Sequence, residues 1–393
     1  MPSTLEFKRL PKLGFRLLGR RFLLNINNLY YWDDYLIMKK IKYALVGFGG
    51  IAENRIAKEG FACDKSRFNG LKHAELVGAM DLNPKRQAAA EALGLKWYNS
   101  LDEIINDKEI EAAFVATNNL SHAAIAKQLL LAGKHVIVEK PISTSIADAA
   151  ELIKIAAERK LSLSVDHMMV NNAWNVKIKD LVAANAIGAV NDGCFHMEFA
   201  YGYDPAESAT WRCSSVAEMG GPIGDVASHC MYVAEYILQS PIVKLAAVYL
   251  PKLMPTKVED GAYIKFTMAN GISASVKVAF SELRGGLSGT LTNLGFEIYG
   301  SEATIRSYGS MFQLSGHPGE PIKIRAEIDK LGEVETIQPA EIKNIYQQLV
   351  EHHAESIQTG QPINAQDALH NLELCAAAHE SAQHNGKLIE VAK

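Results

Sequence analysis

The sequence predicts a two-domain α/β protein, and three observations lead to this prediction. Residues 41–46 form a short apolar run that breaks into a glycine-rich turn and then a helical pattern. Short apolar runs and helical patterns then alternate up to residue 165, which is typical of a parallel sheet. Beyond that point, strand-like segments with alternating polar and apolar residues dominate, which indicates an antiparallel sheet with one covered face. We therefore expect a doubly wound parallel sheet in residues 38–165 and an α+β domain with a large, mostly antiparallel open sheet in residues 166–393.

The glycine-rich turn has the small residues that a dinucleotide site requires. It runs Gly-Phe-Gly-Gly-Ile-Ala from Gly47 to Ala52, a G-x-G-x-x-A pattern. Gly47 permits a tight turn, Gly49 lets a pyrophosphate approach the backbone, and Ala52 lets the helix pack close to its strand. The free N–H groups of the helix N-terminus then face the anion. Because such turns also have purely structural uses, the motif alone does not decide between the two. As cofactor residues of this turn we name Gly47, Gly49, Gly50 and Ile51.

Composition limits the class of protein. At 393 residues the chain exceeds one hydrophobic core, and its 48% hydrophobic and 21% charged residues are ordinary for a globular protein. The net charge of -4 argues against a nucleic-acid surface. No window approaches the roughly 18 apolar residues of a membrane span. The five cysteines are dispersed without zinc-site spacing, so we expect no metal site and a reducing, cytoplasmic location.

Residues 1–37 differ from the rest of the chain. They hold six basic and three acidic residues, and arginines interrupt their apolar positions, which rules out a secretory signal. A transit-type presequence is one interpretation. We favour another, in which residues 1–37 are an extension and Met38 is the true start, because Met38 leads directly into the first strand.

The second strand, at residues 74–80, ends in Asp81. A carboxylate at this position accepts hydrogen bonds from the adenosine ribose hydroxyls and disfavours a 2′-phosphate, so we expect NAD. The spacing from Ala52 is longer than usual and predicts an extended loop at residues 60–72. Asp81 is also suited to cap the helix that follows, and the two roles are compatible. Two nearby basic residues, Lys85 and Arg86, keep NADP as the minority interpretation.

The remaining segments extend both patterns. Further parallel strands are expected at residues 96–98, 111–116, 135–138 and 161–165. Because such sheets bind ligands at the carboxyl ends of their strands, Gly49, Asp81, Asn118 and Lys140 fall at one edge. The second domain is expected to hold helices at 174–186, 222–238, 342–359 and 365–385, and strands at 190–201, 243–249, 261–268, 272–280, 287–299 and 303–307.

Lys140 and one later helix have the residue types of a proton-transfer site. Lys140 follows a strand end and precedes a proline, so its ammonium group is placed to stabilise a developing alkoxide. Its alternative is an exposed surface lysine. Asp225 and His229 lie at i and i+4 on one polar helix face, and histidine takes a proton near neutral pH. The alternative is an amphipathic helix whose Asp225 complements the dipole and whose His229 meets solvent.

Taken together, these motifs resemble the glucose–fructose oxidoreductase/inositol dehydrogenase (Gfo/Idh/MocA) family over residues 40–393. The resemblance rests on the glycine turn, Asp81, Thr117-Asn118-x-x-x-His122, Glu139-Lys140-Pro141, Trp211-Arg212, and G-G-x-x-x-D-x-x-x-H from Gly220 to His229. It implies a Rossmann domain, an open C-terminal sheet that mediates oligomers, and a catalytic set of Lys140, Asp225 and His229. It also adds Thr117, Asn118, His122, Glu139 and Lys140 to the expected cofactor residues. A cis bond before Pro141 is common in the family.

The sequence departs from the family pattern in the substrate pocket. The third glycine of the common G-G-G is Pro222, the acid often found three residues after the histidine is Tyr232, and an arginine is missing near Asn171 and Asn172. The resemblance therefore transfers no particular substrate.

We expect a hydride transfer between nicotinamide and a secondary alcohol or ketone of a sugar, sugar derivative or polyol. In this hypothesis His229 exchanges the hydroxyl proton, Asp225 orients it, and Lys140 stabilises the oxygen. A homodimer or homotetramer is expected, with no nucleic-acid or membrane partner. Two alternatives stay open: a glycoside hydrolase with transient redox, and a non-catalytic dinucleotide-binding sensor. Candidate sugar contacts are His167, Asn171, Asn172, Tyr201, Trp211 and Arg212.

Overall fold

The computed structural model describes residues 39–282, 293–311 and 324–391, and the backbone of four short strands before them. Our prediction that residues 1–37 are an extension concerns residues that, apart from these strands, lie outside the described part of the chain. The prediction that the two domains meet at residue 165 also stays a prediction. The four strands are β1 (Arg16–Leu17), β2 (Arg20–Arg21), β3 (Leu29–Trp32) and β4 (Tyr35–Met38).

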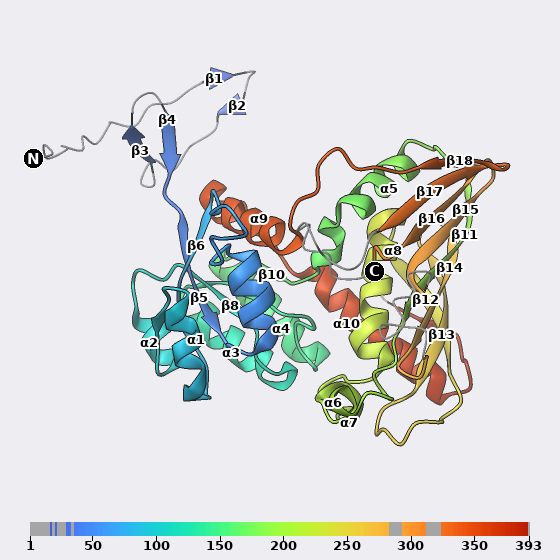
Figure 1. Cartoon of the computed structure of the whole chain (residues 1–393), viewed down its shortest axis with the longest axis horizontal. Helices are drawn as coiled ribbons and strands as arrows, with labels where there is room; N and C mark the ends of the chain where they lie inside the picture. Colours follow the sequence, from blue (N-terminus) through green and yellow to red (C-terminus); the bar gives the residue numbers. More distant parts are fainter. Residues whose placement is uncertain are drawn as a thin grey trace, which may run out of the picture.

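The first domain is a six-stranded parallel sheet with the order β10-β9-β8-β5-β6-β7. Alternate residues of β5 belong to two different hydrophobic clusters, one on each side of the sheet, so the doubly wound prediction is confirmed. Figure 1 shows helices packed around this sheet. The strand order reverses between β5 and β8, which is where such sheets bind ligands. The strands are β5 (Ile41–Val46), β6 (Ala74–Met80), β7 (Lys96–Trp97), β8 (Ala112–Val115), β9 (His135–Val138) and β10 (Leu163–Val165).

Polar capping residues mark where helices of this domain begin. Ser145 caps one of them by accepting a hydrogen bond from the Asp148 backbone N–H at 3.3 Å. The long loop predicted at residues 60–72 is present between the first helix and β6. The helices are η2 (Ala52–Gly60, π-helical), η3 (Pro84–Arg86), α1 (Gln87–Ala92), α2 (Leu101–Asn106), α3 (Asn119–Leu131) and α4 (Ile146–Arg159).

The second domain is built on a nine-stranded sheet with the order β18-β17-β16-β15-β11-β14-β13-β12-β19. All its pairs are antiparallel except β11 with β14, which confirms the mostly antiparallel prediction. The part of the strand predicted at 287–299 that precedes residue 293 lies outside the described residues. The strands are β11 (Val190–Glu198), β12 (Ile242–Tyr249), β13 (Gly261–Met268), β14 (Ser273–Ala279), β15 (Leu294–Gly300), β16 (Thr304–Tyr308), β17 (Arg325–Lys330), β18 (Glu333–Thr336) and β19 (Ile389–Glu390).

Helices of the second half fill the space between the two sheets (Figure 1). Leu349 and Val350 belong to the hydrophobic cluster of the first domain, so the late chain returns to the parallel sheet. Within the described ranges, no helix combines the length and apolar character needed to cross a bilayer. The helices are η4 (Met168–Asn171), α5 (Ala173–Ala183), α6 (Pro205–Ser208), α7 (Trp211–Ser214), η5 (Ile223–Ala227), α8 (Ser228–Leu238), α9 (Ile345–Thr359) and α10 (Gln366–Gln383).

Candidate active site

The glycine turn after β5 leaves open space at the start of a helix. Gly47 has φ +89°, and a Cβ there would lie 2.6 Å from the carbonyl oxygen of Ala116, so this position requires glycine. A Cβ at Gly49 or Gly50 would meet nothing within 4 Å. Ala52, the first residue of helix η2, is buried. The turn is therefore closed on the sheet side and open on the other, which fits the approach of a dinucleotide pyrophosphate.

Asp81 holds this turn from the neighbouring strand. Its Oδ2 accepts a hydrogen bond from the Phe48 backbone N–H at 2.6 Å, and its Oδ1 accepts one from Asn83 N–H at 2.7 Å. The cap of the next helix is Asn83, which accepts from Lys85 N–H at 3.1 Å, so the interpretation of Asp81 as that cap is wrong. The carboxylate lies beside the turn, where our prediction places the adenosine ribose.

Arg86 is hydrogen-bonded and ion-paired to residues of the turn and the helix after it. Its Nε donates to the Phe48 carbonyl oxygen at 2.6 Å, and a second guanidinium nitrogen contacts the Glu53 carboxylate. Glu53 also accepts from Lys58 Nζ at 2.6 Å. The guanidinium group is thus committed to the turn and to a carboxylate.

The loop after β8 is tied to the loop after β9. His122 is fully buried, with Nδ1 2.8 Å from the Pro141 carbonyl oxygen and Nε2 3.2 Å from that of Thr117. Burial lowers the pKa of His122. The structure therefore gives His122 a supporting position between the two loops. The Lys140–Pro141 peptide bond is cis.

Glu218 joins the second domain to the N-terminus of α3, a contact that the sequence did not reveal. Its Oε1 accepts from Asn118 Nδ2 and its Oε2 from Leu120 N–H, both at 2.9 Å. Its carbonyl oxygen accepts from Asn119 Nδ2 at 2.7 Å. A carboxylate at a helix N-terminus is electrostatically favourable, so this is a specific bridge beside the predicted cofactor residue Asn118. The available signal was an acid two residues before Gly220-Gly221.

Lys140 reaches across from β9 to the helix of the second domain. Its Nζ donates to Asp225 Oδ1 at 2.8 Å and to the Asp225 carbonyl oxygen at 2.7 Å. Arg212 Nε donates to the other carboxylate oxygen at 3.1 Å. Burial alone would raise the pKa of Asp225, but the two cations lower it to about 2. The surface-lysine interpretation of Lys140 is therefore wrong, because its side chain is 13% exposed and ion-paired.

His229 is buried beside this ion pair. It is 4% exposed, and its Nδ1 lies 2.7 Å from the Tyr232 hydroxyl oxygen. Burial, and then the charge of Lys140, lower the pKa of His229 well below its usual value, so the ring is neutral near pH 7. The alternative of a solvent-facing histidine is wrong. We expected Asp225 to orient His229. Instead, the Asp225 carboxylate binds Lys140 and Arg212, and His229 is hydrogen-bonded to Tyr232.

Tyr201, Trp211 and Arg212 gather on one side of Asp225. The Arg212 guanidinium carbon lies 5.9 Å from the Tyr201 ring centre and 5.1 Å from that of Trp211. His167 follows strand β10, and its ring stacks on the Tyr232 ring with centres 4.3 Å apart. Four of the six candidate sugar contacts therefore adjoin the Asp225 and His229 groups.

The other two candidates have structural partners. Asn172 is 2% exposed and accepts from Trp174 N–H at 3.1 Å as the cap of α5. Asn171 Nδ2 donates to the Ile345 carbonyl oxygen at 3.3 Å. These hydrogen bonds explain both residues without a sugar, so the structure does not place them with the other four.

Two carboxyl groups lie near Lys140 and were not singled out as a pair. Asp166 is fully buried at the end of β10. Burial, and then the neighbouring Glu139, raise the pKa of Asp166 well above its usual value. Burial also raises the pKa of Glu139, although Lys140 opposes this. Two adjacent buried carboxyl groups cannot both ionise easily, so the surroundings favour the protonated form of Asp166.

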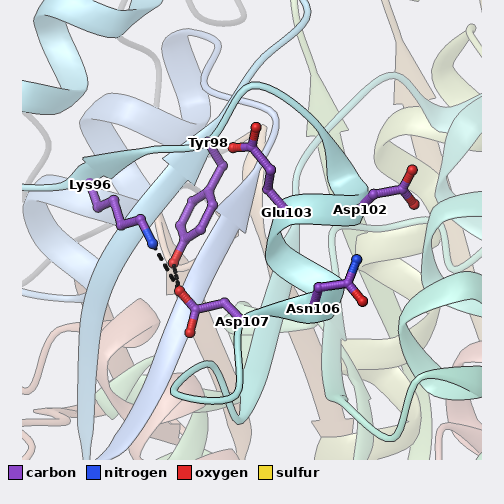
Figure 2. A pocket seen from close by; sticks show the side chains of 6 residues that line it. All are labelled: Lys96, Tyr98, Asp102, Glu103, Asn106 and Asp107. Carbon is purple, nitrogen blue, oxygen red and sulfur yellow. Dashed lines mark hydrogen bonds and ion pairs between the residues drawn. The ribbon is translucent and has the colours of Figure 1, made fainter.

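A surface pocket of the first domain lies elsewhere. Figure 2 shows its lining by side chains of the β7–α2 region, where Asp107 Oδ2 accepts from Lys96 Nζ at 2.9 Å and from Tyr98 Oη at 2.8 Å. Its lining contains none of the predicted site residues. Among the described residues, no cluster of three or more His, Cys, Asp or Glu is arranged to hold a metal ion.

Family models match segments of both domains. Residues 41–167 match an oxidoreductase family with an NAD-binding Rossmann fold, and residues 175–306 match the Gfo/Idh/MocA C-terminal domain. The chain is 28% identical to 1,5-anhydro-D-fructose reductase of Ensifer adhaerens over 243 residues, which cover 61% of this chain and 70% of that protein. It is 27% identical to inositol 2-dehydrogenase of Salmonella agona over 248 residues, 61% of this chain and 67% of the relative.

Solved structures share the fold. Aldose-aldose oxidoreductase from Caulobacter crescentus superposes with a TM-score of 0.77 at 21% identity, over 90% of this chain and 100% of the other. Levoglucosan dehydrogenase in complex with NADH and levoglucosan gives 0.75 at 20% identity, over 90% and 100%. The two domain matches together cover more than half of the sequence, and the chain belongs to the Gfo/Idh/MocA family of oxidoreductases.

Proposed function

We propose that this enzyme moves a hydride between NAD and a secondary alcohol or ketone carbon of a sugar, sugar derivative or polyol. The observation that carries the proposal is the 2.8 Å contact between Lys140 Nζ and Asp225 Oδ1, beside the buried, neutral His229. It places a cation and a proton acceptor where the carboxyl edge of the parallel sheet meets the second domain. The names of the two curated relatives, a sugar reductase and a polyol dehydrogenase, support the substrate class.

The residues of the first domain fit a dinucleotide. The open face of Gly49 and Gly50 would receive the pyrophosphate at the helix N-terminus, and Asp81 would accept from the adenosine ribose hydroxyls. Thr117 and Asn118 at the start of α3, with Glu139 and Lys140 after β9, would hold the nicotinamide half. When bound, the dinucleotide accepts or donates the hydride.

The proton transfer of the reaction is assigned to His229 of the second domain. Oxidation of an alcohol removes a hydroxyl proton as well as the hydride, and the neutral imidazole of His229 is the group that takes it. The Lys140 ammonium group stabilises negative charge on the reacting oxygen. Asp225 holds Lys140 in place and balances its charge. In the reverse direction the same groups return the proton to the carbonyl oxygen.

The aromatic and basic side chains beside Asp225 suit a polyhydroxylated substrate. Tyr201 and Trp211 offer apolar ring faces, and Arg212 offers donors for hydroxyl oxygens beyond the Nε that binds Asp225. His167 adds a further polar edge from the segment after β10. Arg212 thus links the sugar contacts to the catalytic ion pair.

We propose NAD rather than NADP as the cofactor, and the charges beside the glycine turn support this choice. Asp81 lies beside the turn with its carboxylate, and a 2′-phosphate there would meet a like charge. Arg86, one of the two basic residues that kept NADP open, donates instead to the Phe48 carbonyl oxygen and contacts Glu53. Both facts support the NAD preference that the sequence predicts.

We further propose that copies of the chain pair through the outer face of the nine-stranded sheet. Val248 and Tyr263 lie opposite each other on β12 and β13 and are 48% and 50% exposed. Tyr299 on β15 is also exposed. Exposed aromatic and aliphatic side chains on one sheet face suit an interface between copies. A dimer or tetramer by light scattering that Tyr263→Glu dissociates is the expected result, and a wild-type monomer would contradict it.

The activity is tested with a screen. Sugars, nucleotide sugars, inositols and other polyols are incubated with NAD⁺ or NADP⁺, and ketoses and lactones with the reduced cofactors, while the absorbance of reduced nicotinamide is followed. We expect turnover on at least one hydroxylated ring or chain with NAD. Release of a leaving group from a glycoside without net absorbance change would replace this function by transient-redox hydrolysis. Binding of NADH without turnover across the panel would favour a non-catalytic sensor.

A further inference from the structure

Tyr232 occupies an unusual position relative to the two histidines of the site. Its hydroxyl oxygen lies 2.7 Å from His229 Nδ1, and the two rings meet edge to face with centres 5.4 Å apart. On the other side its ring stacks on His167 at 4.3 Å and an interplanar angle of 17°. His167 Nδ1 in turn lies 3.4 Å from Asp367 Oδ2 at the start of α10. Tyr232 is therefore fixed between two imidazoles and is itself 5% exposed.

The hydrogen bond determines which nitrogen of His229 is left for chemistry. Because Nδ1 is bound to the phenol, Nε2 is the ring nitrogen that remains to exchange a proton with substrate. As an acceptor, the phenol oxygen can take the hydrogen bond of a protonated Nδ1, which leaves Nε2 unprotonated and able to accept a proton. Tyr232 therefore fixes the ring without bringing a negative charge to it.

The charges around His229 do not favour a second proton on the ring. Lys140 from β9 and Arg212 from α7 are cations, and the Asp225 carboxylate is shared between them. His167 adds no negative charge and is paired with Asp367. Burial, and then Asp166 and Glu139, raise the pKa of Tyr232, although the Met169 backbone opposes this, so the phenol is not ionised. A neutral imidazole is the state that these groups stabilise.

We propose that Tyr232 is the positioning residue of His229, holding Nδ1 so that Nε2 serves the substrate and, being uncharged, keeping the ring a proton acceptor in mildly acidic solution. This role rests on the proposed function, in which His229 exchanges the substrate proton. A carboxylate at the same place would instead stabilise the imidazolium ion. The side chain at position 232 therefore determines the pH range over which the His229 ring accepts a proton.

The direct test is the titration of His229 by long-range ¹H–¹⁵N correlation in the full chain, which needs no substrate. In the wild type we expect one neutral tautomer that persists well below pH 6.5. Tyr232→Phe keeps the stacked ring but removes the hydroxyl, so the spectrum should show a mixture of tautomers. Tyr232→Glu should raise the pKa of His229 by about one to three pH units, the usual effect of an adjacent opposite charge.

Tyr236→Phe is the matched control on the same helix. It also removes a hydroxyl from a ring of α8, where Lys179 Nζ lies 4.8 Å from the ring centre, and it should leave the His229 spectrum unchanged. Melting temperature and NADH affinity show that each variant is folded, and Tyr232→Phe alone decides the matter if Tyr232→Glu does not fold. A single tautomer with the wild-type titration in Tyr232→Phe would overturn the proposal.

Activity separates this proposal from the proposed function. Once a substrate is known, Tyr232→Phe should lower kcat by about tenfold, the loss of roughly 1.4 kcal/mol in the transition state, with little change in KM for NAD. Tyr232→Glu should move the acidic limb of the pH–rate profile upward with the His229 titration. If the titration changes as expected but no substrate is found, Tyr232 still positions His229 and only the proposed activity fails.

Discussion

The ammonium nitrogen of Lys140 lies 2.8 Å from Oδ1 of Asp225, a residue 85 positions later in the chain. The contact joins the end of strand β9 to the first turn of the helix that carries His229. Arg212 takes the second oxygen of the same carboxylate at 3.1 Å. One buried anion therefore fixes a cation from each domain, and the geometry of the site depends on it.

Asp225→Asn should destabilise the folded chain. Removing one partner of a buried ion pair leaves Lys140 and Arg212 uncompensated, which typically costs about 3 kcal/mol. Because the folded pKa of Asp225 is about 2, below the unfolded value near 4, its contribution is present above about pH 4 and is lost as pH falls through about 2. Denaturant unfolding at pH 7 and pH 3 measures the difference.

The matched control for that substitution is Asp192→Asn. Asp192 pairs with Lys265 on the surface at 3.2 Å, with exposed fractions of 47% and 56% for the two side chains. Exposed pairs contribute little, so the control should change the free energy of unfolding by less than about 1 kcal/mol. Equal losses of unfolding free energy in the two variants would show that the Asp225 ion pair contributes no more than an exposed pair.

Gly47 and Gly49 should respond to substitution in opposite ways. Gly47→Ala places a Cβ 2.6 Å from the Ala116 carbonyl oxygen at φ +89°, so it should lower the free energy of unfolding by about 2 kcal/mol or more. Gly49→Val meets open space and should leave the melting temperature unchanged. It should nevertheless weaken NADH binding by about tenfold or more. NADH affinity equal to the wild type in Gly49→Val would remove the turn from the cofactor site.

Much of this arrangement follows from local sequence. The parallel strands are apolar runs bounded by clear turn signals, and β6 begins and ends where the pattern predicts. Lys140, Asp225 and His229 became candidates through their positions at a strand end and on one helix face, and the family resemblance implied that they form a catalytic set. Strands β17 and β18 were missed, since β17 buries only Ala326 and Ile328 among charged residues and β18 is exposed throughout. Two-residue β19 is too short for any pattern.

Partners across the domain boundary are what the sequence does not specify. The i and i+4 spacing suggested that Asp225 serves His229, but Lys140 and Arg212 arrive from other elements and take both carboxylate oxygens. Asn171 and Asn172 have sugar-binding chemistry, yet a helix cap and a contact to α9 use them. Glu218 has no local motif because its partners lie about 100 residues away. Such pairings depend on how the two domains pack.

Asp81 should set cofactor preference. Wild-type protein should bind NAD⁺ more tightly than NADP⁺, and Asp81→Ser should reduce or reverse that preference, because a like-charge contact can cost several kcal/mol. Asp81→Asn is the informative companion, since it removes the charge and keeps an oxygen that can accept from Phe48 N–H. Calorimetric titration of both cofactors measures the ratio. Equal wild-type affinities that neither substitution alters would refute the assignment.

Glu218 should control how long the cofactor stays bound. Glu218→Ala removes the acceptor of Asn118 Nδ2 and Leu120 N–H, and hydrogen bonds to a charged group contribute about 1.5–3 kcal/mol. Stopped-flow fluorescence should show faster NADH release, by about tenfold or more. Glu341→Ala, whose side chain is 70% exposed, is the control and should release NADH at the wild-type rate. Equal NADH release rates in both variants would mean that the Glu218 hydrogen bonds do not slow cofactor release.

The measurement that bears most directly on the proposed mechanism is the turnover of His229→Ala on the substrate found by the screen. Loss of a positioned acid–base group should lower turnover by about two to four powers of ten, with NADH affinity close to that of the wild type. His384→Ala, an exposed histidine, should retain full activity. Adding Lys140→Met to His229→Ala should cost little more than the worse single change, because both groups act on one transition state. A His229→Ala variant that keeps most of the wild-type turnover would contradict the mechanism.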